Sequence, residues 1–92
     1  MKRISFSDEA KSNLRAIPKR IAMNILTGIH RLAETGVGDI KKLEGIEPTE
    51  FRLRVGDYRV RFTEESGDIL RIHAVKKSQR GVSEVMGSIT VN

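Results

Sequence analysis

The sequence predicts one α+β domain over residues 1–92. An N-terminal strand and a helical hairpin are expected to pack on one face of a mainly antiparallel four-stranded sheet, with a short C-terminal segment after it. Three observations predict this fold. Apolar residues recur at helical spacing in the first third of the chain, they alternate with polar residues from position 51 onward, and two short glycine-containing turns separate the alternating stretches. A chain of 92 residues has room for a single hydrophobic core.

The chain begins with an expected strand and helix. Residues 2–6 alternate in character, with apolar side chains on one side, as in a half-buried strand. Ser7 or Asp8 can cap a helix over residues 8–17, which Pro18 then interrupts. The N-terminal strand therefore leads directly into the first helix.

A second helix is expected over residues 18–34. Proline is tolerated in the first turn of a helix, and Gly36 marks the end of the helical pattern. We expect Met23 to fill the core beside the main apolar stripe of this helix. The stripe itself is expected to face the sheet, and consists of Ile21, Ile25, Ile29 and Leu32.

The rest of the chain is expected to form a three-stranded meander. Residues 36–49 are Gly-rich and charged, typical of a connector that holds at most a brief strand. Residues 51–55 and 58–62 alternate between apolar residues and arginine, and the Gly-Asp pair between them is typical of a tight two-residue hairpin. A second turn leads into a strand over residues 69–75. One face of that strand is expected to carry Leu70, Ile72 and Ala74.

Composition and charge limit the classes of function. Seventeen Lys and Arg against twelve Asp and Glu give a net charge of +5, which favours polyanionic partners. The absence of cysteine excludes disulfides and thiolate metal sites, and two histidines are too few for a convincing metal site, so we expect no cofactor. No apolar stretch approaches the roughly 20 residues needed to cross a membrane, and no secretory leader is present. We therefore expect a cytoplasmic protein with no membrane partner.

Four arginines form the main candidate site. If the hairpin closes as predicted, Arg52 lies opposite Arg61 and Arg54 lies opposite Arg59, on the face away from the helices. Directly opposed like charges are unfavourable by up to about 1 kcal/mol per pair. One interpretation is a solvated strand face, partly neutralised by flanking acidic residues. The other is a phosphate site, since planar guanidinium groups suit phosphate oxygens, and the cost of the opposed pairs favours this second interpretation.

Further polar residues follow on or after the last strand. Lys76, Lys77 and Arg80 extend the basic cluster, and His73 falls on the same face as Arg71 by alternation. A histidine can exchange a proton near neutral pH, although an ordinary strand histidine is the alternative here. The aromatic residues fall on the apolar side, so no stacking platform is expected and binding would depend on phosphate contacts.

Three segments resemble the RelE branch of the RelE/ParE superfamily, the toxins of type II toxin–antitoxin modules. The resemblance covers nearly the whole chain, and the order of strand, helical hairpin and meander is also similar. The segments are Lys42-Leu43-Glu44-Gly45, then Phe51-Arg52-Leu53-Arg54-Val55-Gly56-Asp57-Tyr58-Arg59-Val60, and then Arg80 with Ser83-Glu84-Val85.

This resemblance implies a function. Members of the family are similar to compact microbial ribonucleases, and the best-known ones cut messenger RNA in the ribosomal decoding site, by attack of a ribose 2′-hydroxyl on the adjacent phosphate. The resemblance thus implies a ribosome-dependent endoribonuclease, or mRNA interferase, that inhibits translation. Its partners would be a cognate antitoxin protein, the ribosome and mRNA, with no small-molecule cofactor. The positions that match the family's catalytic residues are Arg52, Arg54, Arg59 and Arg80. The remaining candidates for RNA binding are Arg61, Lys76, Lys77 and His73.

Two departures from the family pattern bear on catalysis. The founding toxins carry a catalytic tyrosine after Ser-Glu-Val, where this chain has Met86, which cannot exchange a proton. Family members often carry lysine where this chain has Arg52 and Arg54, and arginine, with a pKa above about 12, is a poor general base. The residue that would accept the proton is therefore not assigned, and His73 is one candidate. Two alternatives follow: a ParE-like toxin that acts on DNA gyrase without cutting RNA, and a weakened homologue that binds its antitoxin as a co-repressor.

Overall fold

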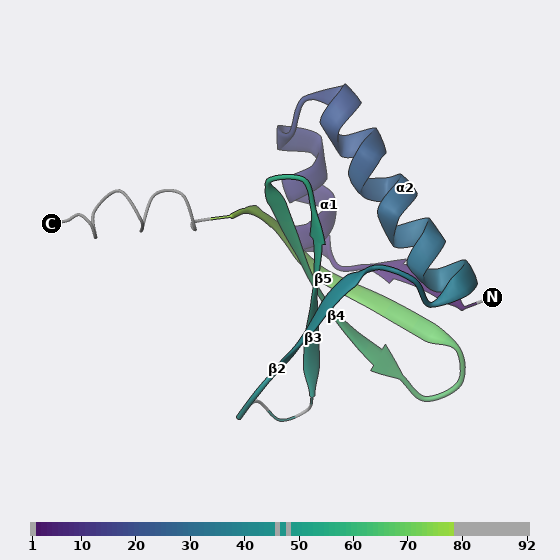
Figure 1. Ribbon diagram of the computed structural model, residues 1–92. Coiled ribbons are helices and arrows are strands. Elements are labelled where there is room, and N and C mark those ends of the chain that lie inside the picture. Colours follow the sequence, from purple (N-terminus) through teal and green to yellow (C-terminus); the bar gives the residue numbers. More distant parts are fainter. Residues whose placement is uncertain (1, 46, 48, 79–92) are drawn as a thin grey trace, which may run out of the picture.

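The computed structural model describes residues 2–45, 47 and 49–78. Two helices lie on one side of a strongly twisted five-stranded sheet (Figure 1). The strand order is β1-β5-β4-β3-β2, in which β1 runs parallel to β5 and every other neighbouring pair is antiparallel. The elements are β1 (Arg3–Phe6), α1 (Asp8–Ala16), α2 (Lys19–Thr35), β2 (Asp39–Leu43), β3 (Glu50–Val55), β4 (Tyr58–Glu65) and β5 (Ile69–Lys77).

The sheet has one strand more than the four that the sequence predicts. The additional strand is β2, which lies in the expected connector and pairs with β3 along its whole length. β2 is exposed at four of its five residues and occupies the edge of the sheet. An edge strand pairs on one side only and buries little, so it does not need the apolar alternation that identifies an inner strand.

The two helices begin and end at local signals. The Ser7 hydroxyl caps α1 by accepting a hydrogen bond of 3.0 Å from the Ala10 N–H. Ile17 is extended after α1, because Pro18 disfavours helical geometry in the residue before it. α2 ends at Gly36, whose φ of 78° lies in the left-handed region that glycine adopts without strain. These ends agree with the predicted ones to within a residue or two.

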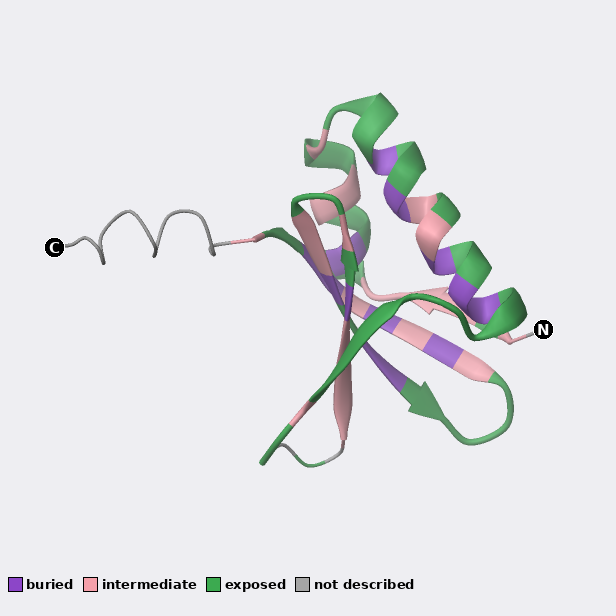
Figure 2. Cartoon of the chain, viewed as in Figure 1, coloured by how far each residue is buried: buried purple, intermediate pink, exposed green. Residues whose placement is uncertain are grey.

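The core lies between the two helices and the sheet (Figure 2). Met23 is outside it and 54% exposed, contrary to the prediction. Met23 is two residues from Ile25, which places it roughly 200° around a helix of 3.6 residues per turn, on the side away from the buried stripe. The clustered buried residues are Ala10, Ile25, Ile29, Leu32, Ala33, Leu53, Val60, Phe62, Leu70, Ile72 and Val75.

A bulge in β5 changes which residues face the core. Arg61 pairs with Ala74 and the next residue, Phe62, pairs with Ile72, so His73 is an extra residue in β5. The predicted alternation therefore does not continue beyond Ile72: Val75 joins the core cluster, whereas Ala74 is buried but lies outside that cluster.

Helix α1 supplies hydrogen-bond partners for backbone groups of β5 at this bulge. The Ser7 hydroxyl donates to the His73 carbonyl at 2.8 Å, and the Val75 N–H donates to the Asn13 side-chain oxygen at 2.9 Å. β1 pairs with β5 only as far as Ile72, and these contacts come from the helix that follows β1. α1 thus takes the place of a neighbouring strand along this part of β5.

No helix in the described part of the chain is both long enough and apolar enough to cross a membrane.

Candidate nucleic-acid interface

The opposed arginine pairs are present in the register that the sequence predicts. Arg52 pairs with Arg61 and Arg54 pairs with Arg59 across β3 and β4. The turn between the strands is Gly56-Asp57, and Gly56 has the positive φ of 58° that such a turn requires. Since Leu53 and Val60 between these arginines are buried in the core, the guanidinium groups project from the opposite face of the sheet.

β2 brings two residues to this face that sequence reasoning missed. Asp39 pairs with Arg54, and Lys41 pairs with Arg52. Two rows of charged side chains therefore continue across the sheet from β2 to β4. The sequence signal that could have placed them there is the alternation of charged Asp39 and Lys41 with Ile40. It could be interpreted only once the segment was known to be a strand.

A pocket of about 310 Å³ opens between these rows. Its guanidinium groups come from two adjacent strands, and each can donate two parallel hydrogen bonds to phosphate oxygens. The pocket is more polar than apolar in its lining, as expected for a site that binds a charged group. The lining residues are Asp39, Lys41, Arg52, Arg54, Arg59 and Ser78.

The three lining arginines are not engaged in ion pairs with described residues. Among the described residues, Arg52, Arg54 and Arg59 form no ion pair, and the one polar contact of Arg54 is a long bond of 3.4 Å from Nε to the Gly56 carbonyl. Arg61 differs, because its Nε lies 3.1 Å from Oε1 of Glu50. Arg61 is also absent from the pocket lining.

The remaining basic candidates lie apart from the pocket. Lys76 pairs in register with Arg59, but its ammonium lies 3.2 Å from the Glu9 carboxylate on α1. Lys77 pairs with Tyr58 and so projects to the other face from its neighbour Lys76. Arg80 and Met86 lie outside the described residues.

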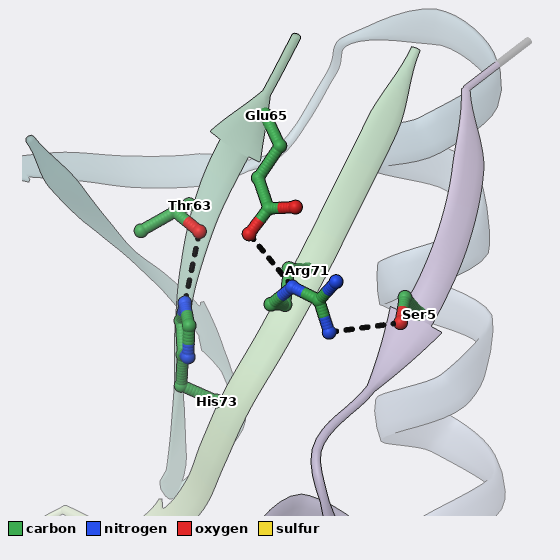
Figure 3. Close-up of polar contacts among 5 residues, drawn as sticks. All are labelled: Ser5, Thr63, Glu65, Arg71 and His73. Atoms are coloured by element: carbon green, nitrogen blue, oxygen red, sulfur yellow. Dashed lines mark hydrogen bonds and ion pairs between the residues drawn. The ribbon is translucent and has the colours of Figure 1, made fainter. Parts of the chain in front are cut away.

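His73 belongs to a separate polar group on the same face (Figure 3). Its Nε2 lies 2.8 Å from the Thr63 hydroxyl, and Thr63 is a buried polar residue. His73 does not line the arginine pocket. The sheet face therefore carries His73, as alternation predicted, but the structure does not place it against the three pocket arginines.

Arg71 connects three strands beside His73. Its Nε donates to Glu65 at 2.7 Å and its Nη1 donates to the Ser5 hydroxyl at 3.2 Å (Figure 3). The hydrogen bond to Glu65, together with the charge of that carboxylate, raises the pKa of Arg71 above its usual value. Because Arg71 is held by these contacts, it acts as part of the sheet rather than as an open anion site.

A second cavity, larger than the arginine pocket, lies elsewhere on the described part of the chain. It is a groove of about 760 Å³ with a mainly apolar lining, formed by β1, α2 and the residues that follow α2. It shares no lining residue with the arginine pocket. We place the candidate site at the smaller pocket, because that is where unpaired charge converges. No group of three or more His, Asp or Glu side chains suited to hold a metal is present among the described residues.

Comparisons with known proteins agree with this fold. Residues 4–81 match the family described as ParE toxin of type II toxin-antitoxin system, parDE. Among curated proteins, no sequence matches the chain significantly.

Solved structures are similar over most of the chain. A chain of the archaeal RelE–RelB complex from Pyrococcus horikoshii OT3 has a TM-score of 0.72 and 26% identity, with 86% of this chain and 97% of that chain covered. The isolated RelE toxin of E. coli has a TM-score of 0.72 and 16% identity, with 98% and 100% covered. A chain of the YoeB dimer from Staphylococcus aureus has a TM-score of 0.65 and 19% identity, with 82% and 94% covered. The last two likenesses concern the fold alone.

Proposed function

Because the chain belongs to the ParE toxin family of type II toxin–antitoxin systems, we propose that it is a toxin that inhibits translation by cutting messenger RNA on the ribosome. The observation that supports this proposal is the pocket lined by Arg52, Arg54 and Arg59, none of which forms an ion pair with a described residue. Opposed guanidinium groups destabilise the sheet unless an anion lies between them. A nucleotide backbone supplies such an anion.

The arginines have distinct roles in this proposal. Arg59 and Arg54 lie opposite each other and would hold the scissile phosphate from two sides. Donors preorganised around a phosphate stabilise the charge that develops there when a 2′-hydroxyl attacks, and this is often a large part of catalysis. Arg52 would extend this phosphate site toward the neighbouring nucleotide. Arg80 is proposed as a further phosphate ligand on the basis of its family match.

A cognate antitoxin is the proposed regulatory partner. The similar archaeal chain was solved in a RelE–RelB complex. An antitoxin that covers the arginine pocket, or that alters the register of β3 and β4, would prevent phosphate binding. In this proposal the ribosome and mRNA are the targets of the free toxin, and neither a cofactor nor a membrane takes part.

A translating extract tests the proposal. Purified toxin is added to a defined message, and cuts are mapped by primer extension with and without engaged ribosomes. We expect cuts only on translated message, and Arg59→Ala is expected to lower the cutting rate about 100-fold or more. Arg15→Ala is the matched control, since Arg15 is an exposed arginine at the end of α1, outside the pocket.

A second candidate is inhibition of DNA gyrase. The family that matches this chain is described by its ParE toxin. The resemblance to the ParE branch implies a toxin that acts on gyrase without cutting RNA. Intact message in the extract, together with inhibited supercoiling by purified gyrase, would establish this second function and exclude the first.

A further inference from the structure

The arginine pocket contains one side chain that can accept a proton. Of its lining residues, the arginines and Lys41 carry positive charge at neutral pH, and Ser78 offers a hydroxyl, which is a very weak base. Asp39 supplies a carboxylate. Among the described residues, it is therefore the only lining group with basic lone pairs suited to general base catalysis at neutral pH.

Asp39 is placed in the same row as the phosphate-binding arginines. It pairs with Arg54 across β2 and β3, and Arg54 pairs with Arg59 across β3 and β4. Paired residues of antiparallel strands have Cα atoms about 4.5–5.5 Å apart. A phosphate held between the Arg54 and Arg59 guanidiniums would lie no more than two strands from the Asp39 carboxylate. At that separation the ribose next to the phosphate can reach the carboxylate.

A role in binding alone does not account for this carboxylate. A negative charge beside a phosphate site repels the ligand, so a pocket selected only for affinity would be better without it. Asp39 also does not hold the arginines in place, since it forms no ion pair with any described residue. It is exposed and available to a substrate.

We infer that Asp39 is the general base of the proposed cleavage reaction, and this inference rests on the proposed function. The Asp39 carboxylate accepts the proton of the ribose 2′-hydroxyl while O2′ forms a bond to the adjacent phosphorus. The bond from phosphorus to O5′ breaks, and O5′ takes a proton from water. The products are a 2′,3′-cyclic phosphate and a 5′-hydroxyl end, and Arg54 and Arg59 stabilise the charge on the phosphoryl oxygens during the step.

This assignment fills the role that Met86 cannot perform. His73 is the other candidate base on the sheet face, but its Nε2 already contacts the Thr63 hydroxyl and it does not line the pocket. The sequence did not indicate Asp39, because its segment was expected to be a connector.

Single-turnover cutting on programmed ribosomes tests the assignment. Measured over a range of toxin concentrations, it gives the maximal rate and the half-saturating concentration separately. Asp39→Asn is expected to lower the maximal rate about 100-fold, the usual scale for loss of a general base. The half-saturating concentration should stay the same or fall, because the change removes a negative charge that repels phosphate. Asp39→Glu, which keeps a carboxylate, should retain more activity than Asp39→Asn.

Glu44→Gln is the matched control. Glu44 is an exposed carboxylate in the turn just after β2, outside the pocket lining. The Glu44→Gln variant should therefore cut like the wild type. An unchanged thermal midpoint of Asp39→Asn confirms that the variant folds.

The pH profile of the maximal rate gives a second readout. A carboxylate acts as a base only when deprotonated, so the wild-type rate should fall tenfold per pH unit on the acid side, and Asp39→Asn should lose that dependence. The charged groups that face Asp39 are Lys41 on its own strand, Arg52 and Arg54 on β3 and Arg59 on β4. Full cutting by Asp39→Asn, or a retained acid limb, would overturn the assignment while leaving the proposed function intact. Absence of cutting by the wild type would remove both.

Discussion

Arg54 and Arg59 lie directly opposite each other across β3 and β4, and neither forms an ion pair with a described residue. This pairing places a cost on the folded state, because like charges at paired positions repel by up to about 1 kcal/mol. The second row is different, since Arg61 in the pair with Arg52 is bound to Glu50. Arg59 and Arg61 lie two residues apart on the same face of β4, one in each row. Substituting each in turn therefore shows how the pairing affects stability and the proposed activity.

Arg59→Thr is expected to stabilise the protein while it abolishes the proposed activity. The change relieves the repulsion with Arg54 and places a β-branched residue in a strand. We expect the thermal midpoint to rise by a few degrees, as about 1 kcal/mol shifts a domain of this size by roughly 4–8 °C. Arg61→Thr is the comparison, and it should not raise the midpoint because it also breaks the contact with Glu50. Equal rises for both variants would show that the Arg54–Arg59 pair is not specially strained.

Salt dependence should show how many pocket arginines contact phosphate. Each phosphate contact on single-stranded RNA releases about 0.7 counterion, so the slope of log affinity against log salt falls by about 0.7 when one contact is removed. Arg59→Ala should show this reduction in fluorescence polarisation with a short single-stranded RNA. Arg15→Ala, on the exposed end of α1, should leave the slope unchanged. An unchanged slope for Arg59→Ala would mean that Arg59 does not contact the backbone.

The sequence predicts those features that depend on local signals. Pro18 and Gly36 limit α2, and the Gly-Asp turn alone sets the register that opposes Arg54 to Arg59. Each of these follows from the backbone preferences of one or two residues, so no knowledge of distant partners is needed.

Features that depend on pairing partners could not be predicted. β2 is an exposed edge strand whose apolar alternation is broken at Lys42, so Asp39 and Lys41 could not be placed in the site until the strand was known. The bulge at His73 is visible only from the register of β4 against β5, and it moves Ala74 away from the core face. One extra residue inverts every later position in a strand, since the side-chain period is two.

The contacts of Ser7 predict a large effect of a small substitution. Its hydroxyl accepts from the Ala10 N–H and donates to the His73 carbonyl, so it caps α1 and satisfies the bulge of β5 at once. Ser7→Ala should lower the free energy of unfolding by about 2 kcal/mol, which combines loss of an N-cap with an unsatisfied carbonyl. Ser12→Ala, an exposed position within α1, should be neutral or slightly stabilising in the same urea titrations. Equal effects of the two changes would contradict the proposed double role.

Gly28 in the middle of α2 allows the helix to approach β3, and this predicts a reversal of the usual effect of Gly→Ala. Alanine normally stabilises a helix interior by about 1 kcal/mol relative to glycine. Here an added Cβ would lie 2.9 Å from Cγ2 of Val55, a stiff β-branched side chain, so the helix or strand would have to move. We therefore expect Gly28→Ala to destabilise the wild type by about 1 kcal/mol, the low end of the range for overpacking. In a Val55→Ala background the clash is absent, and the same change should become neutral or stabilising. A double-mutant cycle from urea denaturation measures this coupling, and additive effects would show that α2 and β3 are not in close contact at Gly28.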